Sequence, residues 1–168
     1  MATPTNLPAS FSTGAVLTAA QMNDLRGAFR ILQVIEGLGA TSDTDNSTTT
    51  FVDSGLSATI TPSSTSSKIL VITSQELFKS IGNLANGCLI RLMRGTTEIN
   101  RHPYIGFSGT AIEMYAHQGF LWLDSPATTS ATTYKTQIAN NAAAAFVRAM
   151  GASSPVIRGQ MTLMEISA

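Results

Sequence analysis

The sequence predicts a mainly β protein, an antiparallel β-sandwich of jelly-roll-like type, preceded by a short helix and an extended arm. In one segment Leu56, Ala58 and Ile60 alternate with hydroxyl side chains, which is the pattern of a strand with one face in solvent. A turn rich in Pro and Ser then leads to residues 69–72, a continuous aliphatic run. Such a run is typical of a strand that is buried on both faces. The two segments together indicate a sandwich core.

The composition limits the size of the fold and the kinds of partner. A chain of 168 residues suits one domain, and its hydrophobic share of 43% is enough for a core. Charged residues make up only 12% of the chain, about half the usual share. With a net charge of zero, no global field favours nucleic acid or an acidic membrane. The low charge favours surfaces that pack against copies of themselves, although a β-rich protein without partners would share this composition.

We divide the chain into residues 1–29, an arm and a helix, and residues 30–168, the sandwich domain. The first 14 residues contain two prolines and isolated apolar positions, Leu7 and Phe11, and have no core of their own. Such an arm is either a frayed terminus or a segment that laces onto another protein.

A helix is predicted to start at Thr18, because Gln21 follows three residues later and completes a capping box. Apolar residues then recur at steps of three and four and form a stripe, which is too short to establish a coiled coil. The stripe could pack against other copies or dock on the sandwich of its own subunit. β-Branched residues after Arg30 favour a strand, so we end the helix near Phe29. The residues of the stripe are Met22, Leu25, Phe29 and Leu32.

Further strands are expected along the rest of the chain. Residues 88–94 and 97–100 form a predicted hairpin around Gly95 and Thr96. Other predicted strands run to about Phe78, over 131–138 and over about 145–149, while residues 41–49 are expected to form a solvated polar loop.

Two predicted strands, residues 112–123 and 160–166, are apolar on both faces. Phe120 and Trp122 alternate with Leu121 and Leu123, while Met161 and Leu163 alternate with Met164 and Ile166. A sheet in a sandwich has one inner face, so the second apolar face must be buried elsewhere. This argues for packing between subunits. The interface candidates in these strands are Trp122, Met161 and Met164.

Residues 101–110 are predicted to form the most aromatic loop of the protein. It contains His102, Tyr104 and Phe107, which are candidates for contact with a receptor. The alternative is that these side chains fold back and cover the end of the sandwich.

Nothing in the sequence indicates catalysis or a cofactor. The two histidines lie in different elements, no phosphate-binding or nucleophile motif occurs, and Cys88 is expected to be a buried apolar filler. Asp43 and Asp45 have the spacing of calcium ligands, but the glycine and glutamate of an EF-hand are missing. We expect that the protein has no enzymatic activity and binds no metal and no cofactor.

No signal peptide or membrane-spanning run is apparent. We therefore expect synthesis in a cytoplasm, no insertion into a membrane and release by some other agent.

Four segments resemble a domain of tailed-bacteriophage fibres and other virion proteins. They are "FSTGAVLTAAQMNDL" (11–25), "TTTFVDSGLSATITPSSTSSKILVI" (48–72), "DSPATTSATTYKTQI" (124–138) and "GQMTLMEISA" (159–168).

The resemblance implies a homotrimeric structural protein of a phage virion, made in the host cytoplasm. It would be a small tail fibre or appendage that is held by other virion proteins through residues 1–29 and exposes the sandwich to the host. The alternatives are a trimeric capsid decoration protein and a carbohydrate-binding module, and a host surface glycan is a further candidate partner.

Overall fold

The computed structural model describes residues 14, 16, 31–80, 87–105, 112–143, 145–151 and 159–167. All the regular structure in these residues is β-strand, as predicted. The predicted N-terminal helix lies outside the described residues. The strands are β1 (Ile31–Leu38), β2 (Thr44–Asn46), β3 (Val52–Ile60), β4 (Lys68–Lys79), β5 (Cys88–Arg94), β6 (Thr97–Ile105), β7 (Met114–Gln118), β8 (Leu121–Asp124), β9 (Thr132–Asn140), β10 (Val147–Ala149) and β11 (Gln160–Ile166).

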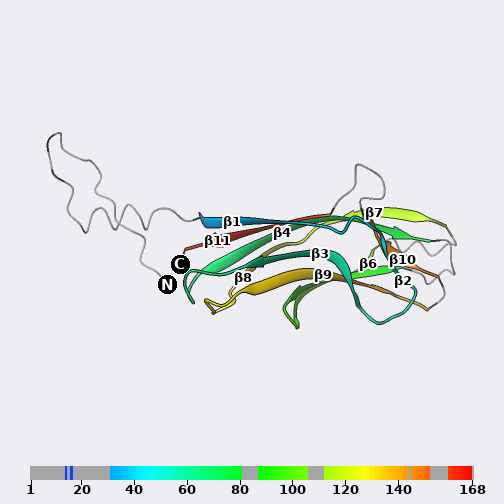
Figure 1. The fold of residues 1–168 in the computed structure, drawn as a ribbon. Coiled ribbons are helices and arrows are strands. Elements are labelled where there is room, and N and C mark those ends of the chain that lie inside the picture. Colours follow the sequence, from blue (N-terminus) through cyan, green and yellow to red (C-terminus); the bar gives the residue numbers. More distant parts are fainter. Residues whose placement is uncertain are drawn as a thin grey trace.

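The strands form two antiparallel sheets that stack as a sandwich (Figure 1). In the first sheet β4 is central. Its first half lies between β11 and β8, its second half lies between β10 and β7, and β1 and β2 pair with β11 and β10. The second sheet has the order β3-β9-β5-β6. With β1 and β2, β7 and β8, and β10 and β11 each counted as one strand, the chain alternates between two four-stranded sheets, which is the jelly-roll topology. The predicted fold class is confirmed.

Strands β7 and β8 replace the single long strand that was predicted for residues 112–123. The break lies at Gly119, where a Cβ atom would come within 2.3 Å of the Thr73 carbonyl oxygen. The Phe120 amide donates to Thr73 Oγ1, and the Thr73 amide donates to the Phe120 carbonyl. Both halves therefore stay on the same edge of β4.

The core lies between the sheets and follows the period of two in the sequence. Leu56, Ala58 and Ile60 of β3 point inward and are buried, as predicted. In β4, Ile69 and Val71 are buried, whereas Ile72 is 37% exposed. The prediction that residues 69–72 are buried on both faces is thus wrong for a single subunit, because nothing in the described part of the chain covers their outer side.

Two predicted loops are partly strand. Residues 44–46 form β2, which pairs with β10 through the register Asp45↔Arg148. Arg148 also forms ion pairs with Asp43 and Asp45, so these carboxylates serve a structural contact. Residues 101–105 continue β6 along the edge of the second sheet, where Pro103 is tolerated because an edge strand leaves amides without partners.

A polar cluster joins the two sheets at one end of the core. Asp124 of β8 accepts hydrogen bonds from Arg94 Nη1 of β5, at 2.9 Å, and from Tyr134 Oη of β9, at 2.6 Å. Burial and the hydrogen bond to Asp124 raise the pKa of Tyr134. Since the carboxylate is nearly buried and has both partners, the cluster fixes how β8 sits against the second sheet.

Candidate interaction surface

One half of the first sheet carries an outward apolar surface, which we call the apolar face. Side chains of a strand alternate between its two sides, so those that point away from the core can be assigned from burial and register. Four strands contribute to it: β1, β11, β4 and β8. The apolar face consists of Leu32, Val34, Leu70, Ile72, Leu121, Leu123, Met164 and Ile166.

The register aligns four of these side chains into one apolar row across the sheet, whereas the neighbouring row is apolar at Leu121 and Ile72 and polar at Thr162 and Glu36. Val34 lies opposite Met164, Met164 opposite Leu70, and Leu70 opposite Leu123. Directly opposed residues on one face have Cβ atoms about 4.5–5.5 Å apart, so the row is continuous from one edge of the sheet to the other.

The side chains at the two edges of the apolar face are strongly exposed. Leu121 is 73% exposed, Val34 55% and Leu123 54%. Single exposed apolar residues are ordinary, but a contiguous group over four strands marks an interaction site. The apolar face is therefore the strongest candidate surface in the described part of the molecule.

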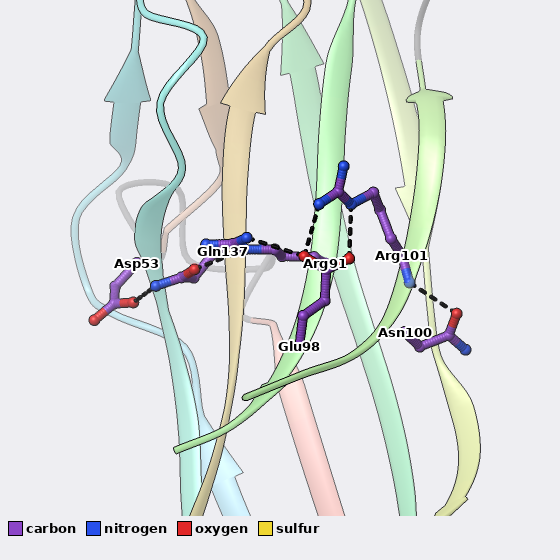
Figure 2. A network of polar contacts seen from close by, with 6 residues as sticks. All are labelled: Asp53, Arg91, Glu98, Asn100, Arg101 and Gln137. Atoms are coloured by element: carbon purple, nitrogen blue, oxygen red, sulfur yellow. Dashed lines mark hydrogen bonds and ion pairs between the residues drawn. The ribbon is translucent and has the colours of Figure 1, made fainter. Parts of the chain in front are cut away.

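The outer side of the second sheet is different in kind, and we call it the charged face. Figure 2 shows its polar network, which runs from β3 through β9 and β5 to β6. Glu98 accepts hydrogen bonds from Arg91 Nη1 at 2.9 Å and from Arg101 Nη2 at 2.7 Å. Gln137 Oε1 accepts from Arg91 Nε at 2.8 Å, and Gln137 Nε2 donates to Asp53 at 2.6 Å. The charged face consists of Asp53, Arg91, Glu98, Arg101, Lys135 and Gln137.

On the charged face, acidic and basic side chains neutralise one another's charge. Hydrogen bonds from Arg101 lower the pKa of Glu98. Burial alone would raise the pKa of Asp53, but hydrogen bonds from Lys135 and Gln137 outweigh it and lower the pKa. These charges have partners within the subunit and remain partly exposed to solvent, where such pairs contribute little to stability.

A buried carboxylate lies on the core side of the sheet that carries the apolar face. Glu165 of β11 is fully buried and accepts hydrogen bonds from the Ser63 amide at 2.7 Å, from Ser63 Oγ at 2.6 Å and from Gln33 Nε2 at 2.6 Å. Burial acts to raise the pKa of Glu165, but these hydrogen bonds outweigh it and lower the pKa to about 2. Glu165 thus ties β1 and the turn after β3 to β11.

The structure offers little for chemistry in its described ranges. No group of three His, Cys, Asp or Glu residues there could hold a metal ion. Burial raises the pKa of the Cys88 thiol to about 12, which removes the thiolate at neutral pH. Among the described residues, no helix is long and apolar enough to cross a membrane.

The structure separates the interface candidates of the last two strands. Met164 lies on the apolar face, opposite Leu70, and stays an interface candidate. Met161 was wrongly chosen, because it points inward opposite Thr73 and is fully buried in the core of its own subunit. Trp122 also lies on the inner side, opposite Val71, but stays 38% exposed at the sheet edge.

The remaining candidates fall into two groups. Leu32 lies in β1 on the apolar face, and His102 lies in β6 with its ring stacked on Phe120 at 4.5 Å between centroids. His102 therefore helps to close one side of the core. Tyr104 lies in β6 but its side chain is outside the described part, as are Leu7, Phe11, Met22, Leu25, Phe29 and Phe107.

The interface candidates that the sequence provides omit most of the apolar face. Leu121 and Leu123 form the second apolar side of their predicted strand, but the candidate from that strand is Trp122. Val34, Leu70 and Ile72 lie in runs of aliphatic residues, where a period of two gives no contrast between the sides.

Comparison with known proteins does not assign this chain to a family. No protein-family model and no curated protein matches the sequence. A similar solved structure is described as "Structure of infectious bursal disease virus Gx strain", with 13% sequence identity and a TM-score of 0.40. The match covers 81% of this chain and 37% of that one, so this chain spans little more than a third of the other. A likeness of this degree says nothing of what this chain binds or builds.

Proposed function

We propose that the chain is a non-enzymatic structural protein of a phage virion, a small tail fibre or appendage that assembles as a homotrimer. The resemblance of four of its segments to phage fibre proteins supports the virion and the trimer. The two-sheet sandwich supports a role as a rigid building block, since its core and inter-sheet cluster need no ligand.

The apolar face is the observation that carries this proposal. One subunit alone leaves Leu121, Leu123 and Val34 largely in water. Burying apolar surface contributes about 25 cal/mol per Å², so association that covers these side chains is favourable. Closed symmetry lets identical copies cover such a surface without leaving one unpaired.

The direction of attachment follows from where the N-terminal residues join the sandwich. Ile31 begins β1 opposite Ile166, close to the end of β11, and both lie at the same end of the sandwich (Figure 1). Residues 1–29 therefore join the sandwich at that end, where we place the contact with other virion proteins. The opposite end, with β2, β7 and β10, is left to face the host.

A non-enzymatic role is supported by the state of the reactive groups. Cys88 is buried, and Glu165 is committed to hydrogen bonds inside the subunit. Glu98 and Asp53 are committed to cations on the charged face. In the described part of the chain, these side chains are thus engaged by partners or by burial within the subunit.

The experiment is to locate the protein on the virus particle by electron microscopy with a bound antibody fragment. A tail fibre or appendage predicts label at the tail, in few copies. Label spread over the capsid would favour the alternative, a decoration protein that clamps neighbouring capsomers. Particles without label, in which mass spectrometry also fails to detect the chain, would contradict a virion role.

A further inference from the structure

We infer that residues 18–29 of one copy lie across the apolar face of a neighbouring copy. The inference rests on the proposed function, because it names what covers the surface through which copies assemble. It makes the assembly an exchange of N-terminal segments between subunits.

The segment is joined directly to the border of the apolar face. β1 is the edge strand of that half of the first sheet, and the chain enters it at Ile31. Residues 18–29 precede this point with only Arg30 between them. The segment is therefore tethered at the border of the apolar face.

The apolar stripe of the segment continues into the apolar face. Leu32 is the last residue of the stripe, and it lies on the apolar face with 44% of its surface exposed. The other three residues, Met22, Leu25 and Phe29, are apolar and could therefore bury the exposed leucines of β8. Continuity of composition therefore links the two surfaces.

The dimensions of the segment and of the apolar face agree. A helix rises 1.5 Å per residue, so residues 18–29, which are predicted to be helical, would extend over about 18 Å. Four neighbouring strands span three gaps of about 4.8 Å, or roughly 14 Å. One such helix can therefore cross β1, β11, β4 and β8 in a single pass.

The short connection directs the segment to a neighbour. A helix that packs back on the sheet it feeds is usually joined to it by 2–6 residues. Here the predicted helix ends near Phe29 and the strand begins at Ile31, so Arg30 alone would have to reverse the chain. A segment that continues away from its own sandwich avoids this reversal, and the same contact repeated around a symmetry axis closes the assembly.

The test uses the full chain with pairs of introduced cysteines and a short bismaleimide, read on denaturing gels. Leu25→Cys is combined in turn with Leu121→Cys, Leu123→Cys and Val34→Cys, so that the result does not depend on one alignment or on one variant that folds poorly. Cys88 stays in place because it is buried, and the parent protein measures its contribution. The matched control is Leu25→Cys with Ile112→Cys, since Ile112 is 47% exposed but lies off the apolar face.

The inference predicts covalent dimers and trimers for at least one pair with a position on the apolar face, and none for the control or the parent. Sedimentation of the same samples separates the two proposals. A trimer without intermolecular links, or with links only inside one chain, would overturn the inference and leave the homotrimer intact. A monomer would contradict both the segment exchange and the homotrimer.

Discussion

The outer sides of the two sheets enclose one core and yet have opposite chemistry. The apolar face presents leucines that are more than half exposed, whereas the charged face pairs each of its acids with a cation. Both sides would serve equally well as the outside of a solvated sandwich if only the fold mattered. The difference fits our proposal that the charged face meets water and the apolar face meets another subunit.

The comparison also shows how this chain uses a small number of charges. Only 12% of its residues are charged, and five of them gather on the charged face. A chain that spread these charges evenly would break up the row from Val34 to Leu123. No charged residue interrupts that row, although the first sheet carries charges elsewhere, among them Asp45 and Arg148.

The largest effect is expected from charges placed on the apolar face. Leu121→Lys with Leu123→Lys should weaken self-association by about 100-fold or more, because burial of each leucine contributes about 1.5–3 kcal/mol and tenfold corresponds to 1.4 kcal/mol. Sedimentation velocity over a dilution series measures the change. Ile112→Lys, at an exposed position off the face, should leave association unchanged. Equal effects of both variants would erase the distinction between the surfaces.

A smaller effect is expected from Glu165, the carboxylate beneath the apolar face. Glu165→Gln replaces an ionised acceptor by an amide that cannot accept from Ser63 and Gln33 as the carboxylate does. Hydrogen bonds to charged groups contribute about 1.5–3 kcal/mol, and we expect a loss of about 2–4 kcal/mol in the free energy of unfolding. Urea unfolding at fixed protein concentration measures it, and a loss below about 1 kcal/mol would show that Glu165 is dispensable.

The pH dependence of the free energy of unfolding should also show the contribution of Glu165. The pKa of Glu165 is lowered to about 2 from its ordinary value of 4.5, so the unfolded chain takes up this proton first as the pH falls. The contribution of Glu165 is fully present above pH 4.5 and is lost between 4.5 and 2. Unfolding at pH 5.5, 4 and 3 should show a steeper decline for the parent than for Glu165→Gln. Parallel curves would refute this role.

The smallest effect is expected on the charged face. Glu98→Gln removes the acceptor shared by Arg91 and Arg101, yet the site is open to solvent. Exposed ion pairs contribute about 0.2–1 kcal/mol, so we expect a loss below about 1 kcal/mol that fades in high salt. A loss as large as that of Glu165→Gln, measured in the same way, would mean that the charged face is also a structural surface.

The sequence was most informative where inner and outer residues differ in polarity. In β3 the alternation around Ala58 placed each side chain correctly. In β4 the run of residues 69–72 shows apolar side chains on both faces, and the pattern cannot distinguish a core from a surface meant for a partner. Met161 and Met164 show the same limit, because only their pairing with Thr73 and Leu70 reveals which one is inside.

Long-range pairings account for most of what sequence reasoning missed. Gln137 and Asp53, which form a hydrogen bond, are 84 positions apart in the sequence, and Arg91 and Gln137 are 46 apart. No local sequence motif therefore predicts the charged face. The strand over residues 101–105 was predicted as a loop, because Pro103 and aromatic residues have turn character. Its place at an edge, which sequence does not show, is what permits a strand there.

The most direct test of the apolar face as an assembly interface is sedimentation equilibrium of the unmodified full chain at micromolar concentration. The account predicts a species of three times the 17.7 kDa chain mass, and its dissociation should follow from substitutions on the apolar face and not from those on the charged face. A stable monomer of 17.7 kDa under these conditions would contradict it.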